Sequence, residues 1–267
     1  MARRSFDIRA QPGFGFVALL TFFALYLPIA ALVAYSFNAA DSLSRWDGLS
    51  LRWFVSAWHN DTVKDASIRS LILAVWAATL ATIAATMAAL ATTRTRPYRG
   101  LAFKYAFINQ PLMVPEIVTG VALLIVFSRI KVWTGYSGLG YLVVAHTAFC
   151  IPFAYLPIRA RLESMDLTLE RAAADLYATP WRTFRRVTLP LLRPAIIAGF
   201  MLAFVISLDD VVITEFVKSG GQDTLPTYML GQLRRETSPE INAIATVFLA
   251  LSVLLVTAFY FVNRRKP

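Results

Sequence analysis

The sequence predicts an all-α membrane protein with six transmembrane helices. Of its 267 residues, 57% are hydrophobic and only 16% are charged, and the mean hydropathy is +0.58. In ordinary soluble domains about a quarter of the residues are charged, so this composition excludes that class. A bilayer-spanning helix needs about 20 mostly apolar residues. Six stretches qualify, and they are Phe14–Phe37, Leu71–Thr93, Phe103–Ile130, Leu139–Ile158, Ala195–Phe216 and Ile241–Val262.

The first stretch is interpreted as a retained span. Arg3 and Arg4 precede it, as they would in a signal peptide. Its apolar run is longer than the roughly 7–15 residues of a signal core, and no small-x-small cleavage site follows closely. An even number of spans then places both termini on the same side.

The net charge of +10 does not indicate nucleic-acid binding, because the positions of the basic residues correlate with the order of the spans. Basic residues gather in alternate connections, whereas those of the intervening connections are interleaved with acids. Positive charge is typical of the cytoplasmic side. The termini and the connections 94–104 and 159–193 are therefore predicted to be cytoplasmic. The residues behind this prediction are Arg3, Arg4, Arg9, Arg94, Arg96, Arg99, Lys104, seven Arg between Arg159 and Arg193, Arg264, Arg265 and Lys266.

The middle spans have the composition of a packed bundle around a pathway. The second span reads "AATLATIAATMAALATT", and such small side chains permit close helix contacts, inside the bundle or at a subunit interface. The third span holds Pro111 and Pro115, and the fourth holds Pro152 and Pro157. Proline frees backbone carbonyls that neighbouring helices or a water-filled cavity must satisfy, so kinked helices are expected.

Cysteine and histidine indicate no metal or disulfide chemistry. Cys150 is the sole cysteine, so a disulfide framework is excluded. His59 and His146 lie far apart without ligand spacing, and His146 is interpreted as a buried hydrogen-bonding residue.

In the outer connection 38–66, "LRWFVSAWHN" predicts a short surface helix anchored by Trp53 and Trp58; a plain aromatic belt is the alternative.

The inner connection 159–193 is about 35 residues long, far longer than a tight connection requires. Leu162, Met165, Leu169, Ala172, Ala173 and Leu176 recur at helical spacing. Ser164 or Asp166 would cap this first helix. Pro180 is expected to open a second helix with Thr179 as its cap, and "LPLLRP" to end it. On these residues alone, lipid contact and docking of a partner protein stay equally open.

A resemblance favours docking. "LERAAADLYATPWRTFRRVTLPLLRPAIIAG" resembles the coupling loop of the membrane subunits of bacterial ABC importers, with Ala172–Ala173 as its alanine pair and Leu189–Pro190 at its end. In that family the loop enters a cleft of the ATP-binding subunit. Carried over to this chain, the contact would involve Glu170, Ala172, Ala173, Asp175, Tyr177, Leu189 and Pro190.

Two positions depart from the family pattern. Arg171 takes the place of its glutamate, with Glu170 just before, and Tyr177 replaces the glycine of the turn. Glycine there suits a left-handed helix end, which tyrosine adopts at a cost on the order of 1 kcal/mol. Either the turn is built differently, or the ATPase has a compensating surface.

Over essentially the whole chain, the resemblance narrows to the second permease of spermidine/putrescine importers. It is carried by "MVPEIVTGVALLIVF", "SLDDVVIT" and "TLPTYMLGQLRRETSPEINAIATVF". It implies the type I importer fold, a second related permease, two ATP-binding subunits and a periplasmic binding protein. This chain has no G-x-x-x-x-G-K-[ST] loop. It is therefore predicted not to be an enzyme and to bind no cofactor, with ATP and Mg on its partners.

A cation needs negative charge along its passage, and four acids lie at suitable depth. Asp209 and Asp210 are in the fifth span, Glu116 is in the third and Glu240 is at the start of the sixth. Neighbouring residues on a helix point about 100° apart, so at most one of the aspartates faces a given spot. Two alternatives stay open: an acid that bonds backbone or arginine at a helix break without contacting substrate, and Glu116 as the cap of a broken helix.

Other transport and membrane classes fit less well. An intramembrane aspartyl protease needs its two carboxylates on facing helices, which adjacent residues cannot supply. A proton-coupled secondary transporter should show an internal repeat of spans, and none is visible. Related importers of another small amine such as 4-aminobutyrate, or of an opine, are the main alternative.

The glycine-containing connection 217–239 is expected to hold a short helix and to face the binding protein, with a plain surface loop as the alternative.

Overall fold

The computed structural model describes residues 13–42, 45–94, 99–235 and 239–264, whose regular elements are all helical apart from one bridge between Asn38 and Leu49. Arg3, Arg4, Arg9, Arg96, Arg265 and Lys266, which the sequence predictions used, lie outside the described residues. Within the described part, six helices are long and apolar enough to cross a membrane, as predicted.

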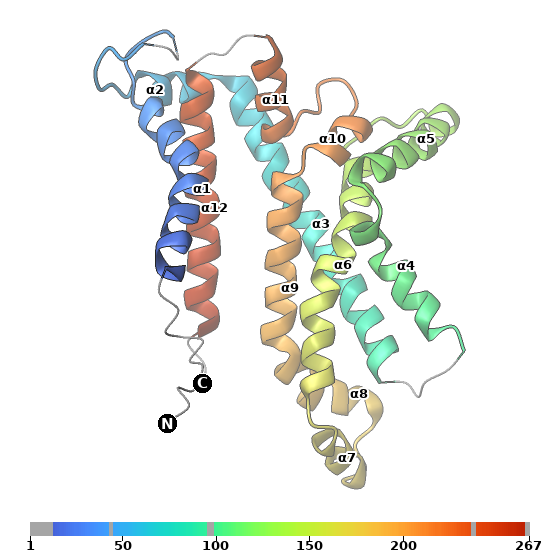
Figure 1. The fold of residues 1–267 in the computed structure, drawn as a ribbon. Coiled ribbons are helices and arrows are strands. Elements are labelled where there is room, and N and C mark those ends of the chain that lie inside the picture. The colour runs from blue at the N-terminus through green and yellow to red at the C-terminus, as the bar shows by residue number, and fades with distance from the viewer. Residues whose placement is uncertain (1–12, 43–44, 95–98, 236–238, 265–267) are drawn as a thin grey trace, which may run out of the picture. The chain divides into compact units, whose positions relative to one another are not determined.

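The helices follow one another along the chain in the order shown in Figure 1. They are α1 (Phe14–Ser36), α2 (Arg52–His59), α3 (Asp61–Thr93), α4 (Leu101–Met113), α5 (Glu116–Thr134), α6 (Gly140–Ser164), α7 (Thr168–Asp175), α8 (Pro180–Thr183), the π-helical turn η2 (Phe184–Thr188), α9 (Leu189–Asp209), α10 (Val212–Val217), α11 (Leu225–Arg235) and α12 (Glu240–Arg264).

The chain forms two compact units. One comprises Met1–Asn60 and Gln232–Leu251, and the other Asp61–Gly231 and Ser252–Pro267. The prediction of a single domain over 1–267 stays a prediction.

The first unit contains α1 and α2, with the connection between them folded around Asn38. This side chain is 1% exposed. Its Oδ1 accepts hydrogen bonds from the backbone N–H groups of Ala40 (3.2 Å) and Asp47 (3.0 Å). The predicted surface helix is present as α2, and Trp53 Nε1 donates to the Ala40 carbonyl (3.3 Å). Trp58 is 74% exposed, and its anchoring in lipid stays a prediction.

The second unit is built on α3, α6 and α9, which run alongside one another in Figure 1. The small residues of α3 form the contact, as the sequence predicted: Ala74, Ala77, Ala78, Ala81, Ala85 and Ala89 have no exposed surface. Gly199 of α9 meets α6 so closely that a Cβ there would lie 2.8 Å from the Ala154 carbonyl oxygen. This unit therefore has a core of closely approaching backbones.

Several predicted helix boundaries were wrong. Helix α3 begins at Asp61 rather than Leu71, and α6 continues to Ser164 rather than ending at Ile158. The third predicted span is two helices, α4 and α5, separated at Val114–Pro115. Val114 is extended, as expected before a proline, and Pro115 stands at the N-cap of α5.

Candidate functional site

The fifth predicted span is also broken, directly after the first of its two aspartates. Helix α9 ends at Asp209, and Asp210 is extended with φ −64° and ψ 133°. A second short helix, α10, then begins at Val212. The expectation of a continuous helix to Phe216 was wrong, because Asp210 offers the following backbone N–H groups a side-chain acceptor instead of a helical carbonyl.

Asp210 caps α10. Its Oδ1 accepts a hydrogen bond from the Ile213 N–H (3.2 Å), and its Oδ2 accepts from the Thr214 N–H and hydroxyl, both at 2.8 Å. The residue is 6% exposed. The structure thus realises the alternative that the sequence left open for this aspartate, an acid bonded to backbone at a helix break.

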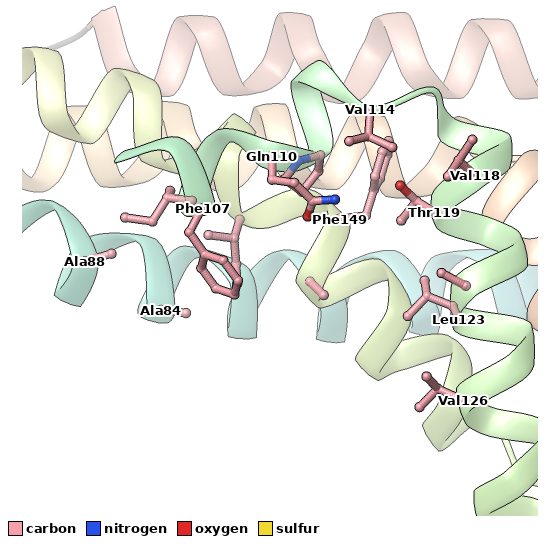
Figure 2. Close-up of a pocket in the computed structure, with 15 residues that line it drawn as sticks. Ala84, Ala88, Phe107, Gln110, Val114, Val118, Thr119, Leu123, Val126 and Phe149 are labelled. Carbon is pink, nitrogen blue, oxygen red and sulfur yellow. The ribbon is translucent and has the colours of Figure 1, made fainter. Parts of the chain in front are cut away.

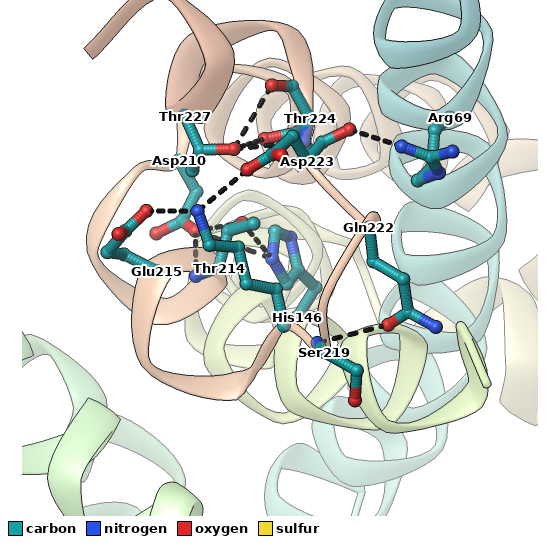
Figure 3. Close-up of polar contacts among 11 residues, drawn as sticks. Arg69, His146, Asp210, Thr214, Glu215, Ser219, Gln222, Asp223, Thr224 and Thr227 are labelled. Atoms are coloured by element: carbon teal, nitrogen blue, oxygen red, sulfur yellow. Dashed lines mark hydrogen bonds and ion pairs between the residues drawn. The ribbon is translucent and has the colours of Figure 1, made fainter. Parts of the chain in front are cut away.

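His146 of α6 contacts both sides of this break (Figure 3). Its Nδ1 lies 2.8 Å from Ser207 Oγ on α9, and its Nε2 lies 3.0 Å from Thr214 Oγ1 on α10 and 3.4 Å from Asp210 Oδ2. The histidine is 1% exposed. The prediction that it is a buried hydrogen-bonding residue is confirmed.

Asp209 is exposed, in contrast to its neighbour. The half-buried Glu116 opens α5, which packs against α10. Phe216 of α10 lies against Gly120, where a Cβ would meet its ring carbon Cδ2 at 2.8 Å. Glu116 lies close to Asp210, to which Asp209 is adjacent in the chain. Three of the four predicted acids therefore lie in one region of the second unit, and Asp209 is the exposed member.

Glu240 belongs to the first unit. It stands in the first turn of α12 and accepts a hydrogen bond from Asn60 Nδ2 at 3.3 Å. A carboxylate is stabilised at a helix N-terminus by the N–H groups there. This position accounts for Glu240 without a ligand, and its predicted role in a substrate pathway stays a prediction.

The connection after α10 is held by charged and polar contacts (Figure 3). Lys218 Nζ lies 2.6 Å from Glu215 Oε2 and 2.7 Å from Asp223 Oδ1. Burial disfavours the charged ammonium, but the hydrogen bonds to Asp223 and Glu215 outweigh it and raise the pKa of Lys218. Arg69 Nη1 of α3 donates to the Asp223 carbonyl (2.7 Å). The predicted short helix in this connection is confirmed as α11.

A cavity of about 540 Å³ lies among α3, α4, α5 and α6 (Figure 2). Its wall is mostly apolar, with Phe107, Val118 and Phe149 among its residues, and Gln110 and Thr119 add polar groups. Asp209, Asp210 and Glu116 are not among its lining residues. The cavity therefore lacks the negative charge that a cation would need.

The predicted coupling segment 159–193 does contain two short helices, α7 and α8, at the end of α6 and α9 opposite α10 (Figure 1). Asp166 caps α7: its Oδ1 accepts from the Thr168 N–H at 2.9 Å, and this bond lowers the pKa of the Asp166 carboxyl. Ser164, the alternative cap, instead donates to the Arg161 carbonyl.

Glu170 turns inward and ties α7 to the rest of the unit. Arg94 Nε, at the end of α3, lies 3.2 Å from both of its carboxylate oxygens. Thr188 of η2 donates its hydroxyl to Glu170 Oε1 (2.9 Å), and Arg94 Nη1 donates to the Leu162 carbonyl (2.9 Å). One carboxylate thereby links α3, α7 and η2. Ala172 and Asp175 are exposed and Ala173 is half-buried.

Tyr177 has φ 58° and is the one non-glycine residue with positive φ in the described part of the chain. Its N–H donates to the Ala174 carbonyl (2.9 Å), and the Ala178 N–H donates to the Ala173 carbonyl (3.0 Å). These two bonds make a Schellman motif. The possibility that the turn is built differently is therefore wrong: the turn keeps the usual left-handed geometry, and the tyrosine adopts it. A compensating surface on the ATPase stays a prediction. Its side chain is 94% exposed.

The second helix of the segment begins as predicted but does not end as predicted. Thr179 caps it by accepting from the Arg182 N–H (3.4 Å), and Pro180 is its first residue. "LPLLRP" was expected to end it, yet the chain passes through η2 directly into α9. In η2 the Leu189 N–H donates to the Phe184 carbonyl five residues back. This wider turn accommodates Pro190, which would clash in a regular helix interior.

The sequence did not single out Thr188, Ser207 and Thr214, on which these contacts depend, and it marked Arg94 only as a basic residue of a cytoplasmic connection. Each acts through a partner distant in the sequence or in another helix, and no local motif marks them. Among the described residues, no group of three or more His, Cys, Asp or Glu side chains is arranged to hold a metal ion.

Comparison with known proteins gives consistent matches. Residues 102–266 match the family described as "Binding-protein-dependent transport system inner membrane component". The chain is 38% identical to the putrescine transport system permease protein PotI of Escherichia coli (strain K12), over 94% of this chain and 90% of that protein. It is 36% identical to the spermidine/putrescine transport system permease protein PotC of Haemophilus influenzae, over 91% and 93%.

Solved structures share the fold at low sequence identity. A subunit of a bacterial ABC transporter involved in the import of the acidic polysaccharide alginate superposes with a TM-score of 0.71 at 16% identity, covering 95% of this chain and 96% of that chain. A chain of the MetNI methionine ABC transporter gives a TM-score of 0.59 at 20% identity, covering 75% and 92%. The predicted fold class, that of type I importer permeases, is confirmed.

Proposed function

The chain belongs to the family of binding-protein-dependent transport system inner membrane components, and we propose that it is a transmembrane subunit of an ATP-driven importer of polyamines such as spermidine and putrescine. It is a multi-pass inner-membrane protein and a permease subunit, not an enzyme. The names of its relatives support the substrate class.

The observation that carries the proposal is the contrast between the two aspartates. Asp210 is committed to capping α10, whereas Asp209 is exposed at the end of α9 with Glu116 and Asp210 in the same region. A carboxylate within or at the end of a membrane span is costly to desolvate, and such acids typically mark an ion or substrate path. A polyamine carries two or more positive charges on a flexible chain, and an exposed carboxylate at this depth is its natural counter-charge.

The family supports a proposal for the assembly. We propose that this subunit pairs with a second, related permease in the lipid bilayer, that two ATP-binding subunits dock on α7 and α8, and that a periplasmic binding protein delivers the substrate. ATP and Mg would reside on the ATP-binding subunits. The proposed orientation has both termini and α7–α8 in the cytoplasm, in agreement with the basic residues of that segment.

Docking on α7 and α8 is supported by what these helices expose. Leu176, Tyr177 and Trp181 are 81%, 94% and 68% exposed. Such a cluster of apolar side chains outside the spans is typical of a protein interface. The inward Glu170 holds α7 against α3, so that movement of the docked subunit would be passed to the spans through a bonded contact.

The test is ATP-dependent uptake by the complete complex in liposomes with its binding protein. Labelled spermidine, putrescine and 4-aminobutyrate are compared at equal concentrations. Saturable uptake of the polyamines that requires ATP supports the proposal. Uptake of 4-aminobutyrate alone would assign the chain to the same class of permease with another substrate.

A further inference from the structure

We propose that His146 is the positioning residue of the pathway: it holds the break between α9 and α10 so that Asp209 is presented to the cation while Asp210 stays buried. This inference rests on the proposed function, because Asp209 is its end point. His146 itself is 1% exposed and does not touch the substrate in this account.

The contacts span the break. Ser207, bonded to His146 Nδ1 at 2.8 Å, lies in the last turn of α9, two residues before Asp209. Thr214, bonded to His146 Nε2 at 3.0 Å, lies in the first turn of α10. A single imidazole on α6 therefore fixes the end of one helix and the start of the next. Without it, the extended residue Asp210 would be a pivot between them.

The direction of each hydrogen bond follows from the donors available. Thr214 has one hydroxyl hydrogen, which it donates to Asp210 Oδ2 (2.8 Å), so its oxygen must accept from His146 Nε2–H. In the neutral imidazole Nδ1 is then the acceptor, and Ser207 donates to it. The resulting chain runs Ser207 to His146 to Thr214 to Asp210, and every member is buried. Such fully satisfied networks rigidify their surroundings.

The position of the Asp209 carboxylate matters for cation binding. Groups that contact a ligand must be held to within about 0.5 Å by supporting contacts. Asp209 has no described contact that could hold its own carboxylate, so its position depends on the backbone at the end of α9. His146 supplies that support from a third helix, through Ser207 on one side of Asp209 and Thr214 on the other.

The test is a double-mutant cycle measured as putrescine uptake by the complete complex. His146→Asn and Asp209→Asn are each expected to raise KM about tenfold. The double variant is expected to lie within about twofold of Asp209→Asn alone, because residues that act through one another are not additive. His146→Gln, whose amide nitrogen reaches the Nε2 position, should recover part of the affinity.

The outcomes separate the two proposals. The positioning role would be overturned if the increases in KM of the two single variants multiply in the double variant, or if KM is unchanged in His146→Asn. Either result would leave the proposed function intact. A wild-type KM in Asp209→Asn would overturn the contact between Asp209 and the cation, and with it the positioning role of His146, while the putrescine uptake itself would still support the proposed function. His59→Asn, on the exposed helix α2, is the matched control and should leave KM unchanged. If His146→Asn does not assemble, Ser207→Ala enters the same cycle with the same criteria.

Discussion

Replacing the two aspartates separately by alanine should affect stability very differently. Asp209→Ala removes an exposed carboxylate, and surface changes of this kind usually alter the free energy of unfolding by no more than about 0.5 kcal/mol. Asp210→Ala removes the acceptor of three hydrogen bonds at a residue that is 6% exposed. The adjacency of the two positions makes each the control of the other.

The magnitude for Asp210→Ala follows from the groups left behind. The N–H groups of Ile213 and Thr214 would lose their acceptor in residues with no exposed surface. A buried donor without a partner costs about 1–3 kcal/mol. Removing the carboxylate also removes its own desolvation penalty, which offsets part of the loss. The net decrease in the free energy of unfolding is therefore expected to be about 2–4 kcal/mol.

The assay is reversible unfolding of the purified chain in mixed micelles with increasing SDS, followed by tryptophan fluorescence. Asp210→Asn is a useful intermediate, since its amide oxygen can still accept one of the bonds, and it should lose less than Asp210→Ala. Equal destabilisation by Asp209→Ala and Asp210→Ala, or a smaller effect of Asp210→Ala, would refute the assignment of Asp210 to the cap.

Three further predictions concern other contacts and use the same unfolding measurement. Gly199→Ala should destabilise by about 1–3 kcal/mol, because its Cβ would lie 2.8 Å from the Ala154 carbonyl oxygen and force α9 from α6; a neutral result would contradict the close approach. Tyr177→Gly should raise the free energy of unfolding by up to about 1 kcal/mol by relieving the left-handed conformation, and a loss of stability would contradict this. Because the pKa of Lys218 is raised in the folded state, the ion pairs of Lys218 contribute to the free energy of unfolding below its ordinary pKa of 10.5. This contribution is lost as the pH rises through the pKa of the folded state. Lys218→Met should therefore be less stable than wild type at neutral pH, and the difference in the free energy of unfolding should narrow above pH 10.5. A difference independent of pH would refute the ion-pair account.

The spans were predictable because their signal is local. Twenty apolar residues suffice to identify a span, and all six were found this way. The breaks were only partly predictable. Pro115 predicted a kink in the third span, but whether a proline bends a helix or separates two depends on what satisfies the freed carbonyls. "LPLLRP" looked like a terminus because the π-helical turn that accommodates Pro190 leaves no mark in the sequence.

The site was less predictable than the fold because its contacts are distant in the sequence. The surrounding sequence does not distinguish Asp209 from Asp210. The difference depends on the contacts of Asp210 with Thr214 and with His146, which is 64 residues earlier in the chain. Likewise Arg94 and Glu170 are 76 residues apart. The left-handed Tyr177 could be anticipated, because a family resemblance marked the position as one that requires positive φ.

The most direct test of the central claim is substrate protection of a thiol placed at each aspartate. Cys150, the sole native cysteine, is fully buried, so a membrane-impermeant thiol reagent should leave it unmodified. In the complete complex, Asp209→Cys should be modified about tenfold faster than Asp210→Cys, because reactivity follows exposure, and putrescine should slow the modification at position 209 only. Equal rates at the two positions, or no protection of position 209 by a transported polyamine, would contradict the account.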